Sequence, residues 1–257
     1  MRIFPLFLCL LFSISYSSHD IAAEELEIVV GWDKPPYVIS ADHSGFEMDL
    51  VRAIFADIGH EISPIYVPFG RTARLLKYDN VDVALTINSS HKVDAALLTD
   101  AYIIYQNVAV SRADRALTVN SFEDLADKSV IAFQTASAVL GEEFGGALSS
   151  LPTYMEMARQ DRQVNMLMLG SVDVIVLDRN IFNFLKGSNE RYANDDTVFH
   201  ELFPITPYRA AIPDKTLREA FNRTLRTFID DGRYQALLDK YGLENLFGKL
   251  QLPVVHP

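Results

Sequence analysis

Residues 45–69, GFEMDLVRAIFADIGHEISPIYVPF, place a helical pattern directly before a candidate strand. In the first part, apolar side chains recur every three or four residues, and Gly59 supplies a typical helix stop. The second part, EISPIYVPF, is a short apolar run of the length expected for a strand. Helix followed by strand is the repeating unit of an α/β fold. The positions on the apolar face are Phe46, Leu50, Val51, Ile54, Phe55 and Ile58.

The same alternation extends in both directions from this stretch. Strand patterns precede and follow it, and later segments combine a short helix with a strand. Such alternation predicts parallel sheets with helices on both faces. The chain closes with two helical segments, the first of which has Leu217, Phe221, Leu225 and Phe228 in register. The strand patterns are 26–32 and 81–87, a short helix is expected over 70–80, the mixed segments are 121–137 and 160–178, and the closing helices are 216–232 and 233–243.

A short internal echo indicates two similar units. NVDVAL at residues 80–85 and SVDVIVL at residues 171–177 each place an aspartate just ahead of an apolar run. Two extended stretches, 103–115 and 205–215, are suited to strands that cross between the units. We therefore predict an α/β fold with two doubly wound lobes, two crossing strands as a hinge, and a cleft between the lobes.

Composition and the first residues narrow the class of protein. The formal charge of −11 and a pI near 4.9 disfavour nucleic acid as a partner. A short apolar run after Met1-Arg2 predicts a signal peptide over residues 1–23, and hence export to the periplasm. Cys9, the only cysteine, lies inside that run, so the mature chain is expected to have neither disulfide nor cysteine metal site. No later apolar stretch is long enough to span a bilayer.

The sequence contains no motif for catalysis or cofactor binding. A phosphate loop, a dinucleotide glycine pattern, a nucleophile elbow and an HExxH helix are all absent. The six histidines are scattered, and none has the spacing of a helical metal pair. We expect a protein without catalytic residues, metal or cofactor.

Several stretches together resemble the polar-amino-acid family of bacterial extracytoplasmic solute-binding proteins. They are GWDKPPYVI, GFEMDLVRAIFADIG, YVPFGRTARLLKYDNVDVALTI, LTDAYIIYQNVAV, SFEDLADKSVIAFQTAS, GSVDVIVLDRNIF and LREAFNRTLRTFIDDGRYQALLDKYGL. The resemblance implies a monomeric periplasmic protein that captures a small polar solute by hinge closure and delivers it to an ABC permease. It also implies lobe 1 over 24–108 and 209–250, lobe 2 over 109–208, and a tail over 251–257.

Two other functions remain open within the resemblance. The protein could signal to a membrane sensor after binding its ligand, because docking surfaces have no readable signature. Alternatively, the family includes dehydratases of cyclic acids, and His91 with Asp178 could supply an acid and a base across the cleft.

His91 is the main departure from the family pattern. In members that bind α-amino acids, an arginine at this position clamps the ligand carboxylate, a task suited to its planar, permanent charge. Three explanations stay open: Arg71 supplies the clamp, the ligand lacks an α-carboxylate, or tight amino-acid binding has been lost. Lys92 could add a point charge if the loop shifts by one residue.

The resemblance implies further ligand-binding residues. Tyr37 and Phe69 would form aromatic walls, and Thr86 would donate a hydrogen bond at a strand end. In lobe 2, Gln134 and Ser137 belong to a turn whose N–H groups favour an anion. Asp178 matches the acid that pairs with a ligand ammonium, although a helix N-cap is its structural alternative.

Overall fold

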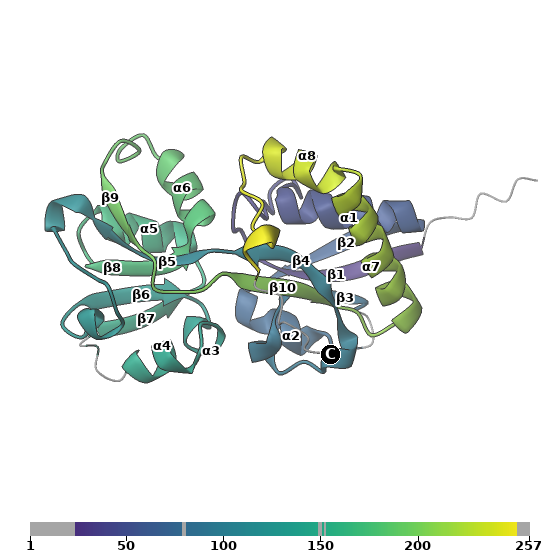
Figure 1. Cartoon of the computed structure of the whole chain (residues 1–257), viewed down its shortest axis with the longest axis horizontal. Coiled ribbons are helices and arrows are strands. Elements are labelled where there is room, and N and C mark those ends of the chain that lie inside the picture. The colour runs from purple at the N-terminus through teal and green to yellow at the C-terminus, as the bar shows by residue number, and fades with distance from the viewer. Residues whose placement is uncertain (1–23, 79–80, 149–150, 152, 251–257) are drawn as a thin grey trace, which may run out of the picture.

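The alternation of strands and helices builds two five-stranded sheets, which confirms the predicted two-lobed α/β fold (Figure 1). The computed structural model describes residues 24–78, 81–148, 151 and 153–250. Lobe 1 contains the sheet β2-β1-β3-β10-β4, and lobe 2 contains the sheet β7-β6-β8-β5-β9. The strands of lobe 1 are β1 (Glu24–Gly31), β2 (His60–Val67), β3 (Val83–Ile87), β4 (Leu98–Tyr105) and β10 (Thr206–Ala211). Those of lobe 2 are β5 (Asn107–Arg112), β6 (Ser129–Phe133), β7 (Thr153–Met157), β8 (Val174–Asp178) and β9 (Thr197–His200).

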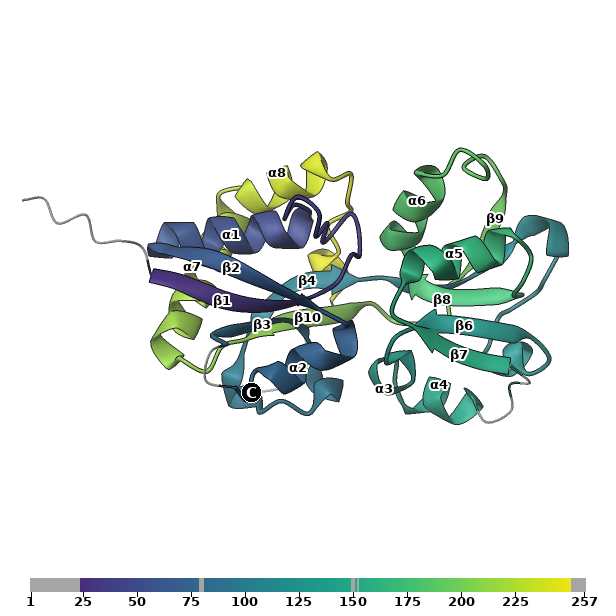
Figure 2. The ribbon, with the colours of Figure 1, turned by 180° about the vertical axis from the view of Figure 1, so that it is seen from behind.

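Helices cover both faces of each sheet (Figures 1 and 2). In lobe 1, the longer helices lie on one side and a short helix lies on the other; in lobe 2 the helices are divided evenly between the two sides. The lobe 1 helices are α1 (Phe46–Ile58), α7 (Lys215–Asp230) and α8 (Arg233–Lys240) on one side and α2 (Thr72–Leu75) on the other. The lobe 2 helices are α5 (Gln160–Met168) and α6 (Arg179–Gly187), opposite α3 (Ala136–Val139) and α4 (Glu142–Ala147).

Helix α1 forms where the sequence predicts it. Its apolar face is buried against the sheet and α7, with the ring centroids of Phe55 and Phe221 5.4 Å apart. Gly59 ends the helix in the left-handed conformation at φ 97°, which glycine adopts without steric cost. One buried position on this helix is charged: Glu47 is fully buried in its first turn.

The echoed aspartates have the same role in both lobes. Asp82 accepts a hydrogen bond from the backbone N–H of Glu27 at 2.8 Å, and Asp173 accepts one from Ser129 at 3.0 Å. Each carboxylate therefore ties the start of a central strand to the neighbouring parallel strand, β1 or β6. The two sheets are built on one plan.

The lobes are joined by two connections that run side by side (Figure 1). Gln106 links β4 to β5, and residues 201–205 link β9 to β10. Strand β10 runs antiparallel to β3, and β5 runs antiparallel to β8, so each sheet is mixed rather than wholly parallel. The antiparallel strand in each sheet is the one that arrives from the other lobe, which the alternation pattern alone could not predict.

Several smaller expectations differ from the structure. The sequence predicts one helix over residues 70–80, whereas the described part of this segment contains a 3-10 turn over Phe69–Arg71 followed by the four-residue α2. The expected helix before β6 is a 3-10 turn over Glu123–Leu125. Apolar periodicity left β7, β9, α3, α4 and α6 unassigned. The predicted signal peptide and tail lie outside the described residues, and the lobe boundaries stay a proposal.

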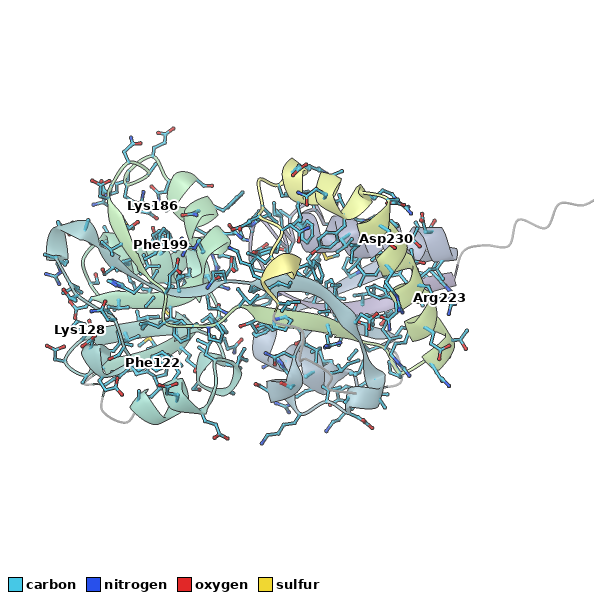
Figure 3. All side chains as sticks on the ribbon, in the orientation of Figure 1. Phe122, Lys128, Lys186, Phe199, Arg223 and Asp230 are labelled. Atoms are coloured by element: carbon cyan, nitrogen blue, oxygen red, sulfur yellow. The ribbon has the colours of Figure 1, made fainter. Side chains whose placement is uncertain are left out.

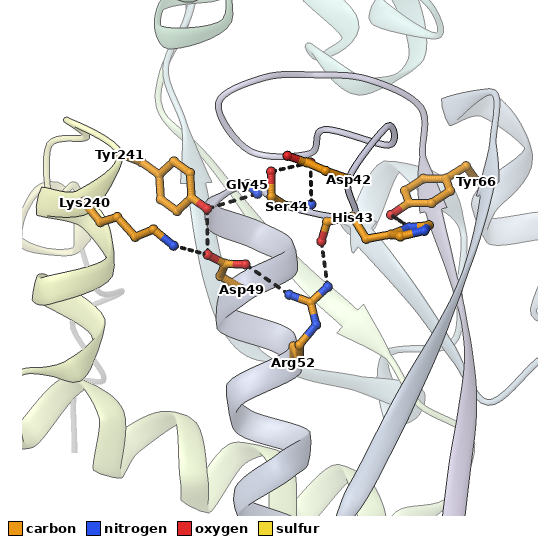
Figure 4. A network of polar contacts seen from close by, with 9 residues as sticks. All are labelled: Asp42, His43, Ser44, Gly45, Asp49, Arg52, Tyr66, Lys240 and Tyr241. Atoms are coloured by element: carbon orange, nitrogen blue, oxygen red, sulfur yellow. Dashed lines mark hydrogen bonds and ion pairs between the residues drawn. The ribbon is translucent and has the colours of Figure 1, made fainter.

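A polar cluster fastens the last helix to the first (Figure 4). Asp49 of α1 accepts hydrogen bonds from Lys240 at 2.7 Å and from the Tyr241 hydroxyl at 2.6 Å, and it pairs with Arg52 at 3.0 Å. The Tyr241 hydroxyl also receives the N–H of Gly45 at 3.1 Å. The C-terminal helix thereby fixes the start of α1. This part of α1 contains Glu47, which pairs with the pocket residue Lys34. Within the described residues, no helix is long and apolar enough to cross a membrane.

Candidate ligand-binding cleft

A pocket lies between the lobes and takes its walls from both. Its free volume is about 40 Å³, room for only a few water molecules, so a larger ligand enters only when the lobes move apart. Aromatic rings and polar or charged side chains contribute equally to the walls, and this combination of apolar surface with placed polar groups is typical of a small-molecule site. The rings belong to Trp32, Phe69, Tyr105, Phe133 and Tyr208, and the polar and charged residues are Lys34, Asn107, Gln134, Gln160 and Asp178.

The lobe 1 side of the pocket is a buried ion pair. Lys34, which is 4% exposed, donates to Glu47 Oε2 at 2.6 Å, to Thr86 Oγ1 at 2.6 Å and to the Tyr105 hydroxyl at 3.0 Å. An ammonium has three protons, so every donor of Lys34 is used inside the protein. Glu47 is further bound by the hydroxyls of Thr86, at 2.6 Å, and Tyr102.

Burial and pairing act in opposite directions on the Lys34 ammonium. Desolvation lowers the pKa of Lys34, and the charge and hydrogen bond of Glu47 oppose that change. Because the pair is closed by hydrogen bonds on both partners, it contributes no net charge to the pocket. The lobe 1 side of the cleft is therefore polar but neutral.

The lobe 2 side of the pocket presents a buried carboxylate at the end of β8. Asp178, which is 2% exposed, is the N-cap of α6 and accepts the N–H groups of Asn180 and Ile181 at 2.9 and 3.1 Å. The N–H of Gln106 adds a third hydrogen bond at 2.9 Å. Burial raises the pKa of Asp178 to about 6 in spite of these backbone donors. Among the described residues, no cation forms an ion pair with Asp178.

The lobe 2 turn that was predicted to bind an anion already holds one from the protein. The Glu156 carboxylate accepts the N–H of Thr135 at 2.7 Å, the N–H of Ser137 at 2.8 Å and the Tyr154 hydroxyl at 2.9 Å. Burial alone would raise the pKa of Glu156, but these hydrogen bonds outweigh it and the pKa is lowered. The carboxylate is thus held in its charged form by the turn.

The residue at the position of the family arginine does not belong to the pocket wall. His91 Nδ1 lies 2.7 Å from Asn88 Oδ1, and its ring packs edge-on against Phe69 with centroids 5.4 Å apart. Burial lowers the pKa of His91, which favours the neutral ring. The two alternative cations, Arg71 and Lys92, are both exposed and lie outside the pocket lining.

The remaining predicted residues are divided between the pocket and the contacts around it. Phe69 and Gln134 line the pocket, whereas Tyr37 stacks on the lining residue Tyr105 with ring centroids 4.4 Å apart. Thr86 is buried in the ion-pair network at a φ of 59°, and Ser137 is exposed beside Glu156. Their role in binding stays a prediction.

Side chains at the cleft also join the two lobes. Gly70 N of lobe 1 donates to Gln134 Oε1 of lobe 2 at 3.2 Å, and Asn180 Nδ2 donates to the Tyr37 hydroxyl at 3.0 Å. Phe69 and Phe133 meet edge to face at 6.4 Å. The lobes therefore touch through the same surfaces that enclose the pocket.

Three residues that decide the character of the cleft were not predicted from the sequence: Lys34, Glu47 and Glu156. One signal was available. Glu47 lies within the apolar stripe of α1, and a charged residue on a buried helix face requires a partner. Lys34, in a loop beside two prolines, and Glu156, in an unassigned strand, follow no local pattern.

The described residues do not contain a group of three histidine, cysteine or acidic side chains placed to hold a metal. Of the predicted pair His91 and Asp178, only Asp178 lines the pocket, while the His91 ring packs on Phe69.

Two α/β lobes around a lined cleft, joined by a double hinge, are the architecture of a solute-binding protein. Residues 26–244 match the model of the bacterial extracellular solute-binding proteins, family 3. Since this match covers most of the chain, the protein belongs to that family. No curated protein sequence matches the chain closely enough to count as a relative.

Solved structures with the same fold include binding proteins and a sensor domain. A variant of the arginine-binding protein ArgBP from T. maritima is 23% identical with a TM-score of 0.71, covering 85% of this chain and 95% of that one. A histidine kinase sensor domain with similarity to periplasmic binding proteins is 19% identical with a TM-score of 0.72, covering 87% and 99%. The ancestral amino acid-binding protein AncCDT-1, a precursor of cyclohexadienyl dehydratase, is 20% identical with a TM-score of 0.67, covering 84% and 94%.

Proposed function

We propose that this protein is a periplasmic, monomeric binding protein that captures a small polar solute between its lobes and delivers it to an ABC permease. The observation that carries the proposal is the cleft itself. Its walls come from both lobes, and the lobes touch through wall residues such as Phe69 and Phe133. A ligand in the pocket would contact both lobes at once and so favour their closure.

Binding and closure can be tested together on the mature protein. A thermal-shift panel of amino acids, amines, dicarboxylates, cyclic acids and short peptides should contain at least one stabilising solute. A ligand at a hundredfold its dissociation constant adds about 2.7 kcal/mol, which such a measurement resolves. Small-angle X-ray scattering should show a smaller radius of gyration with that solute than without it, because the lobes close on the ligand. A panel without any stabilising solute would contradict the proposal.

A ligand-sensing role is the second candidate, because the histidine kinase sensor domain matches this chain with a TM-score of 0.72. The two roles differ in the partner that meets the closed form. Co-purification of the ligand-loaded protein with the permease or with the sensor ectodomain encoded by neighbouring genes separates them. Ligand-dependent capture of the permease supports transport, and capture of the sensor supports signalling.

We further propose that the protein is not an enzyme. Of the His91 and Asp178 pair that could serve a dehydratase, only Asp178 lines the pocket, because the His91 ring packs against Phe69 instead. Incubation with a cyclic acid such as prephenate should give no product. Turnover that disappears in His91→Ala would contradict this expectation.

A further inference from the structure

The charges around the cleft do not balance. Lys34 and Asp178 line the pocket, and Glu47 is paired directly with Lys34. The ion pair cancels, so the three buried groups sum to one negative charge, which belongs to Asp178. A ligand that carries one positive charge would complete the neutralisation, and a buried charge without a partner is costly.

No cation remains for a ligand carboxylate. Lys34 has used its three protons on Glu47, Thr86 and Tyr105. Among the described residues that line the pocket, no arginine is present. An α-carboxylate brought into this space would meet Asp178 without a counter-charge, which disfavours its binding.

The backbone donors that could bind a carboxylate are also occupied. Thr135 N and Ser137 N both donate to Glu156, whose charged form they stabilise. This second observation is independent of the first, because Glu156 lies in the other lobe from Lys34. Lys34 is therefore not available to a ligand carboxylate because it is paired with Glu47. The turn at Thr135 and Ser137 is not available either, because it already binds the Glu156 carboxylate.

The walls of the pocket suit an organic cation. Five aromatic rings surround the space, and the ring faces of tryptophan and tyrosine attract positive charge. The amide side chains of Asn107, Gln134 and Gln160 can accept hydrogen bonds from an amine without adding a charge.

We propose that the cleft selects a small organic monocation without a carboxylate, recognised by Asp178 and the aromatic walls, and that Lys34 with Glu47 and Glu156 exclude α-amino acids. This inference rests on the proposed binding function and names its ligand class. It corresponds to the second of the three explanations for His91, a ligand that lacks the α-carboxylate.

Matched pairs of probes test the inference by isothermal titration calorimetry on the mature protein. Each amine is compared with the amino acid that differs from it only by the carboxylate: tyramine with L-tyrosine, histamine with L-histidine, and phenethylamine with L-phenylalanine. Choline is compared with glycine betaine. At least one amine or choline should bind about tenfold or more tightly than its carboxylated partner.

Variants identify the groups responsible. Asp178→Asn keeps a good helix N-cap but removes the charge, and it should weaken binding of the cation about tenfold or more. Asp230→Asn, at an exposed carboxylate on the outer side of lobe 1 (Figure 3), is the matched control and should leave binding unchanged. Glu156→Ala frees the N–H groups of Thr135 and Ser137 to bind a ligand carboxylate. It should therefore reduce the ratio between the dissociation constants of each amino acid and its matched amine.

The outcomes separate this inference from the proposed function. If the amino acids bind more tightly than the amines, and Asp178→Asn abolishes that binding, the ligand class is wrong and the binding function stands. Binding of neutral solutes alone would likewise overturn the ligand class and leave the binding function in place. If no member of the pairs or of the wider panel binds, both the ligand class and the binding function are overturned.

Discussion

The two lobes share one plan but end their central strands differently. In lobe 1, β3 ends at Thr86 and Ile87, where side chains from α1 and the preceding loop form a closed ion pair. In lobe 2, β8 ends at Asp178, which accepts three backbone N–H groups and the Tyr37 hydroxyl but forms no ion pair among the described residues. A carboxylate that is paired with a cation does not attract a positively charged ligand, whereas a carboxylate bound only by uncharged donors keeps its negative charge. The same scaffold has thus produced one neutral wall and one anionic wall.

The largest expected effect comes from opening the ion pair in lobe 1. Lys34→Met leaves Glu47 buried without its cation, and breaking a buried pair in this way costs about 3–5 kcal/mol. The free energy of unfolding, measured by urea denaturation, should fall by that amount. Adding Glu47→Gln removes the orphaned charge, keeps acceptors for Thr86 and Tyr102, and should restore at least half of the loss.

Lys77→Met is the control for this comparison, because Lys77 is exposed on lobe 1. Its effect should stay within about 0.5 kcal/mol. A single variant Lys34→Met as stable as wild type, or a double variant no better than the single one, would show that the pair does not hold the lobe 1 wall.

Lys34 and Glu47 also show which parts of the structure can be predicted from the sequence and which cannot. Helices α1, α5, α7 and α8 and strands β1, β2, β3, β6 and β8 follow from apolar patterns, because each buries a face whose spacing is visible in the chain. The cleft could not be predicted in the same way. Lys34 and Glu47 are 13 residues apart, and Thr86 joins them from 39 residues beyond Glu47. Their meeting depends on sheet order, which brings β1 beside β3.

The predicted anion turn teaches the same lesson from lobe 2. Its N–H groups point where local sequence suggests, and they do bind a carboxylate. The carboxylate belongs to β7, a strand that periodicity did not assign, and the parallel pairing of β6 with β7 brings it to the turn. Local sequence patterns thus predict which polar groups need a hydrogen-bond partner, whereas the pairing of strands determines which residue supplies it.

The second expected effect is the pH response of lobe 2, where Asp178 faces Lys34, Tyr37, Tyr105 and Tyr208. Burial raises the pKa of Asp178 from 3.8 to about 6, so the folded state holds this proton more tightly than the unfolded state. Its contribution to stability is complete below pH 4 and is lost as the pH rises through 6, by about 3 kcal/mol.

Asp178→Asn lacks this proton, so its stability relative to wild type should rise by about 3 kcal/mol between pH 4 and pH 7. Urea denaturation at a series of pH values measures the difference. Asp230→Asn should show no such trend, because Asp230 is exposed. A difference between Asp178→Asn and wild type that does not vary with pH would mean that backbone N–H groups fully compensate the buried charge.

The smallest expected effect concerns the fit between the two walls rather than either wall alone. A Cβ at Gly70 would lie 3.0 Å from Thr135 Cγ2 and 3.5 Å from Gln134 Cδ, across the cleft. Gly70→Ala should therefore resist closure and weaken ligand binding by about 1 kcal/mol, while the stability of the free protein stays unchanged. Gly187→Ala, where a Cβ meets nothing within 4 Å, is the control for calorimetry with the same ligand. If both variants bind alike, the lobes do not close as tightly with ligand as the contacts at Gly70 imply, and selection rests on the individual walls rather than on their approach.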